Sequence, residues 1–358
     1  MGLPANCKSI SKEERCLHAA ALAQRDFDEP HFAVYNDKFL ELLGDSPSIE
    51  LGIEKDWPFA HEAGVYLPDQ DAVYITSNGL DTPSGKTIKV GKLIRSSSTG
   101  KWDYDELQTD IAMGNGGINY KGGVLFCDQG DMKSSGGLVL MDPRPPYGTK
   151  TLMSSYHWRR FTSVNDVVVH TDGSLWFTDP IYGFEQGFRP EPQLPCQVYR
   201  FDPNSGDIRV VADGFGRPNG LCFSPDELTL YVTDTDWIHG DGTTDLTRPS
   251  HIYAFDVLDR HGSHFLANRR VFAMADEGIP DGIKCDLQGN VYSGCGDGVH
   301  VWTPGGQLIG KIKVKGGVAN FCFGRRGEMF VLNETKFWVV KFSSKVQGAL
   351  LANMKIEV

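Results

Sequence analysis

The amino-acid sequence predicts an all-β fold, a six-bladed β-propeller with four-stranded blades. Three observations predict it. In a pattern that occurs six times, a polar residue opens a short β-like run, the chain turns at a glycine or a polar pair, and an apolar strand follows. Consecutive copies begin 53, 50, 54, 62 and 39 residues apart, which is the length of one blade with its loops. The 41 glycines and 19 prolines lie mostly between short β-branched and aromatic runs, as in all-β proteins.

The N-terminal part is expected to differ from the repeats. We assign residues 1–45 to an N-terminal extension, partly helical or irregular, and residues 46–358 to a single propeller domain. Within the extension, residues 12–25 favour a short helix, and residues 31–43 indicate a strand followed by a helical turn. Ser48–Ile53 alternates polar and apolar residues, as a half-buried strand does, but it has no hairpin partner of its own. Because an open propeller would leave strand edges unpaired, we expect Ser48–Ile53 to pair with the C-terminal blade and close the ring.

Each repeat is expected to supply the inner hairpin of a blade, and the segment after it the two outer strands. After the third repeat, residues 197–203 and 207–213 read as two strands around an Asn-Ser-Gly turn. The fourth repeat carries a polar insertion, His239–Ser250, which we place on a face of the propeller where it could wall a pocket. Asp179 and Asp234 close the third and fourth repeats at similar places, which indicates a role in stabilising the blades.

The net charge of the chain indicates which kinds of molecule it can bind. The formal net charge is −11 and no block of Lys or Arg occurs, which argues against nucleic acid as a partner. A small molecule, neutral or cationic, or a metal cation fits better. No apolar stretch approaches the ~20 residues that span a bilayer, and the segment LHAAALAQ is a poor secretory signal. These features favour a soluble, cytoplasmic protein, or a secreted one if a signal sequence has been removed; oligomeric state is not indicated.

The residues that open the repeats are the main functional candidates. Each stands just before an innermost strand, so all six should converge at one mouth of the central channel. They are Glu62, Asn115, Asn165, Asn219, Asp281 and Asn320. Two carboxylates with several amide oxygens suit Ca²⁺ or Mg²⁺ better than Zn²⁺. Any one of them alone is better explained as a turn residue that caps the local backbone. The set favours a metal site, because turn formation does not require two carboxylates on one axis.

Other polar and aromatic residues are weaker candidates. His61 could carry a proton, but neighbours on a strand face opposite ways, so it should point away from the channel if Glu62 points inward. His300 alternates with valines and reads as a structural residue. Tyr182 and Trp237 could line an apolar pocket above the polar floor, or could pack as ordinary loop residues. No serine lies in a G-x-S-x-G motif, and no phosphate-cradling loop occurs.

Four phrases of the sequence resemble a known family. They are HEAGVYLP, SVNDVVVHTDGSLWFTDPIYG, RPNGLCFSPDELTLYVTD and IPDGIKCDLQGNVYSGCGDGVHVWTPGGQLIGKI. In this order they resemble the regucalcin and gluconolactonase (senescence marker protein type) family of six-bladed propellers. The similarity looks closest to the fungal lactonohydrolase branch and runs from about residue 31 to the C-terminus.

The resemblance implies a divalent cation held by a Glu, two Asn residues and an Asp. Matched motif by motif, these are Glu62 in HEAGV, Asn165 in SVNDV, Asn219 in RPNGL and Asp281 in IPDGI. Ca²⁺ is the expected ion, with Mg²⁺, Mn²⁺ or Zn²⁺ as substitutes. The implied reaction is lactone hydrolysis, with Asp281 and Glu62 as catalytic residues. The remaining site residues are assigned to the substrate: Asn115, Gln129, Tyr182 and Trp237. Asn320 is then expected to be peripheral.

Two other functions stay open at this point. Where related lactonases place Glu or His near the metal, FCDQG offers Gln129, and an amide orients a substrate but cannot exchange a proton. That difference suits a fungal biosynthetic enzyme on the same scaffold, such as a hetero-Diels–Alderase that joins a quinone methide to a terpene alkene. Its substrate would be a polyketide or terpenoid rather than a simple lactone. A non-catalytic binding propeller ranks last, because it needs no converging carboxylates.

Overall fold

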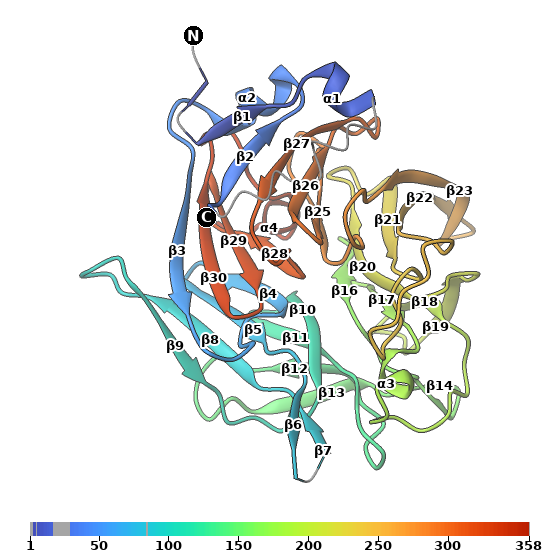
Figure 1. Ribbon diagram of the computed structural model, residues 1–358. Coiled ribbons are helices and arrows are strands. Elements are labelled where there is room, and N and C mark those ends of the chain that lie inside the picture. Colours follow the sequence, from blue (N-terminus) through green and yellow to red (C-terminus); the bar gives the residue numbers. More distant parts are fainter. Residues whose placement is uncertain (1–2, 5, 17–28, 84, 358) are drawn as a thin grey trace.

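A computed structural model describes residues 3–4, 6–16, 29–83 and 85–357 and confirms the six-bladed propeller. Six β-sheets stand around a common axis (Figure 1). The innermost strands are β4 (Glu62–Leu67), β10 (Gly114–Tyr120), β16 (Val167–Val169), β20 (Pro218–Phe223), β24 (Ile283–Cys285) and β28 (Asn320–Phe323). All six contribute to the wall of one small cavity. The six repeats therefore surround a single channel.

Antiparallel strands follow each innermost strand outward. In blades one to three they are β5 (Ala72–Thr76), β8 (Val90–Arg95) and β9 (Trp102–Glu106); β11 (Gly123–Asp128), β12 (Gly137–Met141) and β13 (Thr149–Met153); and β17 (Leu175–Asp179), β18 (Gln197–Phe201) and β19 (Ile208–Ala212). In blades four to six they are β21 (Thr229–Asp234), β22 (His251–Arg260) and β23 (Ser263–Met274); β25 (Val291–Cys295), β26 (Gly298–Trp302) and β27 (Leu308–Lys313); and β29 (Glu328–Asn333), β30 (Lys336–Lys341) and β3 (Ser48–Glu54). Two short hairpins lie in loops, β6 (Leu80–Thr82) with β7 (Gly85–Thr87) and β14 (Ser155–Tyr156) with β15 (Arg159–Arg160).

The ring closes as predicted from the unpaired strand near the N-terminus. Strand β3 pairs with β30 in antiparallel register, from Ser48 opposite Lys341 to Glu54 opposite Lys336. The two strands lie side by side in Figure 1 although they come from opposite ends of the chain. Blade six therefore takes three strands from the C-terminal part and one from the N-terminal part, which leaves no open seam between the first and last repeats.

Blade five is wider than the four strands expected from the repeat. Strand β2 (His31–Val34) pairs with the outer edge of β27, and β1 (Cys7–Ser9) adds to β2 in parallel. These strands have three and four residues, too few for alternation to be detected, and they form because the edge of β27 offers unpaired backbone groups. The first strand of the extension was not predicted. Cys7 within it is a free, buried thiol.

Short helices accompany these strands. Helix α2 (Asp37–Leu43) follows β2, as predicted, and begins at an Asn36 side chain that accepts a hydrogen bond from the Lys38 N–H at 3.0 Å. Helix α1 (Lys12–Cys16) covers the start of the predicted N-terminal helix, whose remainder lies outside the described residues. The division of the chain after residue 45 stays a prediction.

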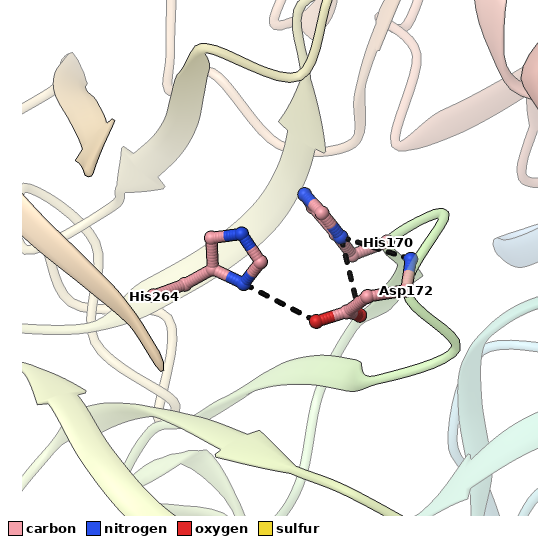
Figure 2. Close-up of side chains that lie close together, drawn as sticks. All are labelled: His170, Asp172 and His264. Atoms are coloured by element: carbon pink, nitrogen blue, oxygen red, sulfur yellow. Dashed lines mark hydrogen bonds and ion pairs between the residues drawn. The ribbon is translucent and has the colours of Figure 1, made fainter. Parts of the chain in front are cut away.

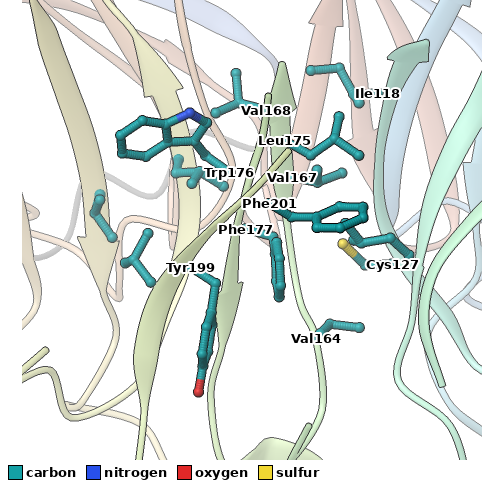
Figure 3. Packing of buried hydrophobic residues seen from close by; sticks show 14 of the residues in the cluster. Ile118, Cys127, Val164, Val167, Val168, Leu175, Trp176, Phe177, Tyr199 and Phe201 are labelled. Carbon is teal, nitrogen blue, oxygen red and sulfur yellow. The ribbon is translucent and has the colours of Figure 1, made fainter. Parts of the chain in front are cut away.

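Buried side chains fill the space between neighbouring blades. The largest cluster joins blades two, three and four, and Figure 3 shows Ile118, Phe177 and Tyr199 among its members. The rings of Phe177 and Tyr199, opposite each other on β17 and β18, stack at 5.3 Å between centroids. Truncating a buried aromatic of this kind costs about 3–5 kcal/mol. Packing within blade three and between blades two, three and four therefore holds these inner strands in place around the channel.

One end of the channel is closed by the C-terminal helix. Helix α4 (Ala349–Asn353) and residues of all six innermost strands enclose a cavity of about 60 Å³, enough for a few water molecules. A larger molecule must therefore enter from the other end, where the repeat-opening residues lie. In the described part of the chain, no helix is long and apolar enough to cross a membrane.

Candidate functional site

The innermost strands depart from regular pairing where the repeat-opening residues stand. The register shifts around Asn115 in β10 and around Asn219 in β20, and in β4 it shifts between Ala63 and Val65, two residues after Glu62. A β-bulge changes the direction that regular alternation would give a side chain and increases the local twist. The bulges thus set how these three side chains leave the strand at the mouth of the channel.

Glycines that follow the repeat-opening residues let neighbouring blades approach closely. A Cβ atom on Gly116 would lie 2.5 Å from the Asn165 carbonyl oxygen, and one on Gly220 would lie 2.4 Å from that of Asp281. The Gly116 N–H instead donates to the Asn165 carbonyl at 2.8 Å, which links blade two to blade three. The glycine in the repeat therefore has a packing role, because it brings consecutive candidate ligands close together around the ring.

Buried aspartates hold the segments that lead into two of the candidate ligands. The Asp179 carboxylate accepts hydrogen bonds from two backbone N–H groups before Asn165, at 2.7 and 2.9 Å. Asp234 does the same for the segment before Asn219, at 2.8 and 3.1 Å. These contacts confirm the structural role predicted for Asp179 and Asp234. Burial raises the pKa of Asp179 to about 7, although the two N–H groups oppose that shift.

Two oxygens of the predicted metal cage are buried without a hydrogen-bond partner. They are Oδ1 of Asn165 and Oδ1 of Asp281. An unpaired buried oxygen costs about 1–3 kcal/mol, so each such atom requires an explanation. A hard cation that prefers oxygen ligands explains both, because it would replace the missing donors. The residues present therefore fit a divalent cation at this end of the channel.

Glu62 is held in place by a residue that was expected to be peripheral. The Asn320 side chain is 1% exposed and donates from Nδ2 to Glu62 Oε2 at 2.7 Å. Its own Oδ1 accepts the Phe321 N–H at 2.8 Å and lies 3.4 Å from Lys284 Nζ. Asn320 is thus fixed on one side by the backbone of β28 and orients the carboxylate of Glu62 with the other. It is not peripheral to the site.

The carboxyl groups of the channel raise one another's pKa. Burial raises the pKa of Asp281 well above its usual range, and the negative charge of Glu62 adds to this rise. Burial also raises the pKa of Glu62, while His61 and the Asn320 hydrogen bond oppose the shift. Asp166 belongs to the same group, since its charge acts on both carboxyls and burial raises its own pKa. Such a concentration of buried negative charge favours a bound cation.

His61 lies beside the cage rather than in it. Its Nδ1 contacts Glu334 Oε1 at 2.6 Å, and Asn78 donates to the other oxygen of that carboxylate at 3.1 Å. Burial lowers the pKa of His61, but Glu334 outweighs this effect, and with Glu62 and Asp281 it raises the pKa to about 10. The histidine therefore adds a positive charge next to the two carboxylates.

Two loops form the wall of the mouth on the side of blades three and four. Tyr182, at the start of helix α3 (Tyr182–Glu185), shares a hydrogen bond with Thr235, and the charge of Asp281 contributes to its raised pKa. Trp237 lies just before the insertion His239–Ser250. Arg217, which is 7% exposed, binds both loops through Glu185 and Asp236. This ion-pair network links the loop that carries Tyr182 to the segment that carries Trp237.

The other two predicted substrate residues lie on blade two. Asn115 is buried and its Oδ1 accepts the N–H of Gly116 at 2.9 Å, so it caps its own backbone. Gln129 follows β11 and is 4% exposed, and its N–H donates to the Met113 carbonyl at 2.9 Å. The loop after Gln129 is bound by Arg189, whose guanidinium donates to carbonyl groups of two segments, residues 131–135 and 161–162. Both residues stand on fixed backbone at the mouth.

Sequence reasoning missed several residues of the site. Asp166 was overlooked because it occupies the place of the repeat's glycine, although an Asn-Asp pair in a series of Asn-Gly pairs was a visible signal. Its Oδ1 accepts the Val167 N–H at 2.9 Å. Lys284 and Arg217 carried no signal, because their partners come from other blades.

A comparison with family models gives one match. The model described as "SMP-30/Gluconolactonase/LRE-like region" matches residues 95–334. Among curated proteins, lactonohydrolase oryH of Aspergillus oryzae is 35% identical over 385 residues, which covers 87% of this chain and 78% of the relative. Lactonohydrolase oryL of the same fungus is 28% identical over 344 residues, covering 86% of this chain and 74% of the relative.

A solved structure supports the same assignment. A gluconolactonase from Xanthomonas campestris superposes with a TM-score of 0.69 at 28% sequence identity, and the match covers 88% of this chain and 96% of that one. The predicted resemblance, including the similarity to fungal lactonohydrolases, is confirmed by these matches.

Proposed function

Because the chain belongs to the SMP-30/gluconolactonase/LRE-like family, we propose that it is a lactone hydrolase that depends on a divalent cation held by Glu62, Asn165, Asn219 and Asp281. The relatives named above are hydrolases of lactones by name, which supports the reaction class. The observation that carries the cation is the pair of buried oxygens, Asn165 Oδ1 and Asp281 Oδ1, that have no hydrogen-bond partner.

Ca²⁺ is the ion that this set of ligands favours. Carboxylate and amide oxygens suit Ca²⁺, which accepts six to eight oxygen ligands, whereas Zn²⁺ prefers nitrogen and sulfur. Bound to these residues, the cation would polarise the ester carbonyl and stabilise the negative charge that develops on its oxygen.

The other steps of the reaction are assigned to residues of the chain. Asp281 carries a free oxygen and a raised pKa, so its carboxylate can accept the proton of an attacking water. Glu62, oriented by Asn320, supplies the second negative charge of the cage. Tyr182 lies near Asp281 and presents a hydroxyl, bonded to Thr235, at the mouth. We assign Trp237, Gln129 and Asn115 to the substrate as well, to orient a neutral lactone by apolar contact and hydrogen bonds.

The presence of Gln129 does not favour a biosynthetic cyclase over a lactone hydrolase. The relatives covering most of the chain carry hydrolase names, so the cyclase alternative is not favoured. A neutral amide at this place is compatible with hydrolysis because Asp281 supplies the base.

The proposal is tested by hydrolysis of a panel of γ- and δ-lactones. Protein stripped with a chelator should lose activity, and added Ca²⁺ should restore it. Asp281→Asn should lower kcat by at least 100-fold, whereas Asp276→Asn, which removes a largely exposed carboxylate from the loop before the same blade, should leave kcat within twofold. Full activity of the stripped protein, or of Asp281→Asn, would refute the assignment.

A further inference from the structure

A second cluster of metal-binding side chains lies at the other end of blade three. His170 directly follows strand β16, Asp172 lies in the turn between β16 and β17, and His264 comes from β23 of blade four. Five residues of nearly extended chain separate His170 from Asn165, which corresponds to about 17 Å. The cluster is therefore separate from the channel cage, and it joins two neighbouring blades.

The three side chains have the spacing of metal ligands. His170 Nδ1 lies 3.1 Å from Asp172 Oδ1, and His264 Nδ1 lies 3.2 Å from Asp172 Oδ2 (Figure 2). One ligand atom from each residue falls within 4.8 Å of the other two. A tetrahedral ion with bonds of about 2.0–2.1 Å holds its ligand atoms about 3.3 Å apart. Both distances from a histidine nitrogen to the Asp172 carboxylate are close to that value, and they run to different oxygens of the carboxylate.

The Nε2 atom of His170 has a carboxylate partner, as in many metal-bound histidines. Its Nε2 lies 3.3 Å from Glu227 Oε2, and Glu227 is fixed by the Thr171 N–H at 3.0 Å. A carboxylate that accepts the Nε2 proton leaves Nδ1 unprotonated and turned toward the ion. With this tautomer, the Nδ1 lone pair accepts the Asp172 N–H at 3.1 Å and also lies 3.1 Å from the Asp172 carboxylate, so a cation bound between the two side chains would take the place of that hydrogen bond.

His264 provides the independent observation. Its Nδ1 is a buried atom that makes no hydrogen bond, although it lies only 3.2 Å from the Asp172 carboxylate. The side chain as a whole is 21% exposed and that of Asp172 30%, so an ion can enter from solvent. A cation bound between this nitrogen and the carboxylate oxygen would supply the partner that Nδ1 lacks.

We propose that His170, Asp172 and His264 bind a divalent transition metal such as Zn²⁺, and that this ion links blade three to blade four. Two imidazoles and one carboxylate select such a metal over Ca²⁺, whose ligands are oxygens. Arg200 donates to Asp172 Oδ2 at 3.0 Å and Ser174 donates to Oδ1, so the ion shares this carboxylate with existing donors. The competing partner of His170 Nδ1 is the Asp172 N–H, which donates to it at 3.1 Å.

The site is tested with Co²⁺, which reports nitrogen ligands through visible d–d absorption. The full-length protein is first saturated with Ca²⁺, so that the channel is occupied, and then titrated with Co²⁺. We expect one equivalent to bind with a tetrahedral spectrum, and Zn²⁺ to displace it. His264→Gln should weaken binding at least tenfold, while His251→Gln, on β22 of the same blade, should not change it.

A circular dichroism spectrum checks that each variant folds, and its thermal unfolding is compared with and without Zn²⁺. Zn²⁺ should raise the Tm of the wild type and of His251→Gln but not of His264→Gln. The proposal is overturned if Ca²⁺-saturated wild type binds no Co²⁺, or if His264→Gln binds it with unchanged affinity and spectrum. The first result would leave the Asp172 N–H as the partner of His170 Nδ1, and the second would place the bound ion elsewhere.

Discussion

Replacing Asp281 by Asn should change stability in opposite directions with and without Ca²⁺. In the Ca²⁺-free protein, Asp281 is a buried acid with an unpaired oxygen, close enough to Glu62 for the two charges to repel. Such a group costs about 1–3 kcal/mol. Asp281→Asn removes the charge and keeps the shape but still leaves one oxygen unpaired, so it should raise the free energy of unfolding of the Ca²⁺-free protein by only about 1 kcal/mol, the lower end of that range.

With Ca²⁺ bound, the wild type is expected to be more stable than the variant. At a Ca²⁺ concentration 1,000 times its Kd, binding stabilises the wild type by about 4.1 kcal/mol. If the loss of one of the two cage carboxylates weakens binding about 100-fold, the same concentration is 10 times the Kd of the variant and stabilises it by about 1.4 kcal/mol. The variant is thus more stable than the wild type in chelator but gains about 2.7 kcal/mol less from Ca²⁺.

Urea unfolding followed by tryptophan fluorescence, in EGTA and in excess Ca²⁺, measures both effects. Asp276→Asn serves as the matched control and should show the same Ca²⁺ stabilisation as the wild type. If Asp281→Asn lowers the stability equally in both buffers, Asp281 is a structural residue. If Ca²⁺ leaves wild-type stability unchanged, the cage does not bind this ion.

Three further predictions concern the surroundings of the cage. Asn320→Ala should weaken Ca²⁺ binding about 10–100-fold in calorimetry, because Glu62 loses the donor that orients it; an unchanged Kd would remove Asn320 from the site. Asp179 has a pKa of about 7 in the folded protein and about 3.9 in the unfolded chain. The free energy of unfolding therefore falls by about 4 kcal/mol as the pH rises between these two values. In urea unfolding, Asp179→Asn should show a smaller decrease in the free energy of unfolding between pH 5 and pH 8 than the wild type. An equal decrease in both proteins would contradict the assignment. Gly220→Ala should destabilise the fold by about 1–3 kcal/mol, because its Cβ would meet a carbonyl of blade five, whereas Gly148→Ala, in open space, should be neutral.

Much of the fold could be predicted because its signal is local and repeated. Each inner hairpin is contiguous in sequence, and β3 was assigned to ring closure because it had no local partner. Strand β1 was missed for the opposite reason: it has three residues and exists only because β2 lies beside it. The repeat could not indicate that blade five would be extended, since that edge is created by the folded sheet.

The sequence indicates the candidate ligands of the cage but not the residues that hold them in place. Glu62 and Asp281 stand in motifs that open innermost strands, so their place on the axis follows from the repeat. Asn320 looked like a turn residue because the carboxylate it holds is 258 positions away in the sequence. His264 is likewise distant from Asp172 in the sequence, and a motif search finds only the His-x-Asp part of that cluster.

The most direct test of the account compares Ca²⁺ binding with catalysis in one preparation. Calorimetry gives the Kd and the stoichiometry, and the rate of lactone hydrolysis is measured across the same range of free Ca²⁺. We predict one Ca²⁺ per chain and a half-maximal rate at the measured Kd, with both values shifting together in Asn165→Ala. Hydrolysis at full rate below the Kd, or a rate that follows a different constant, would contradict a cation held by Glu62, Asn165, Asn219 and Asp281 as the centre of the reaction.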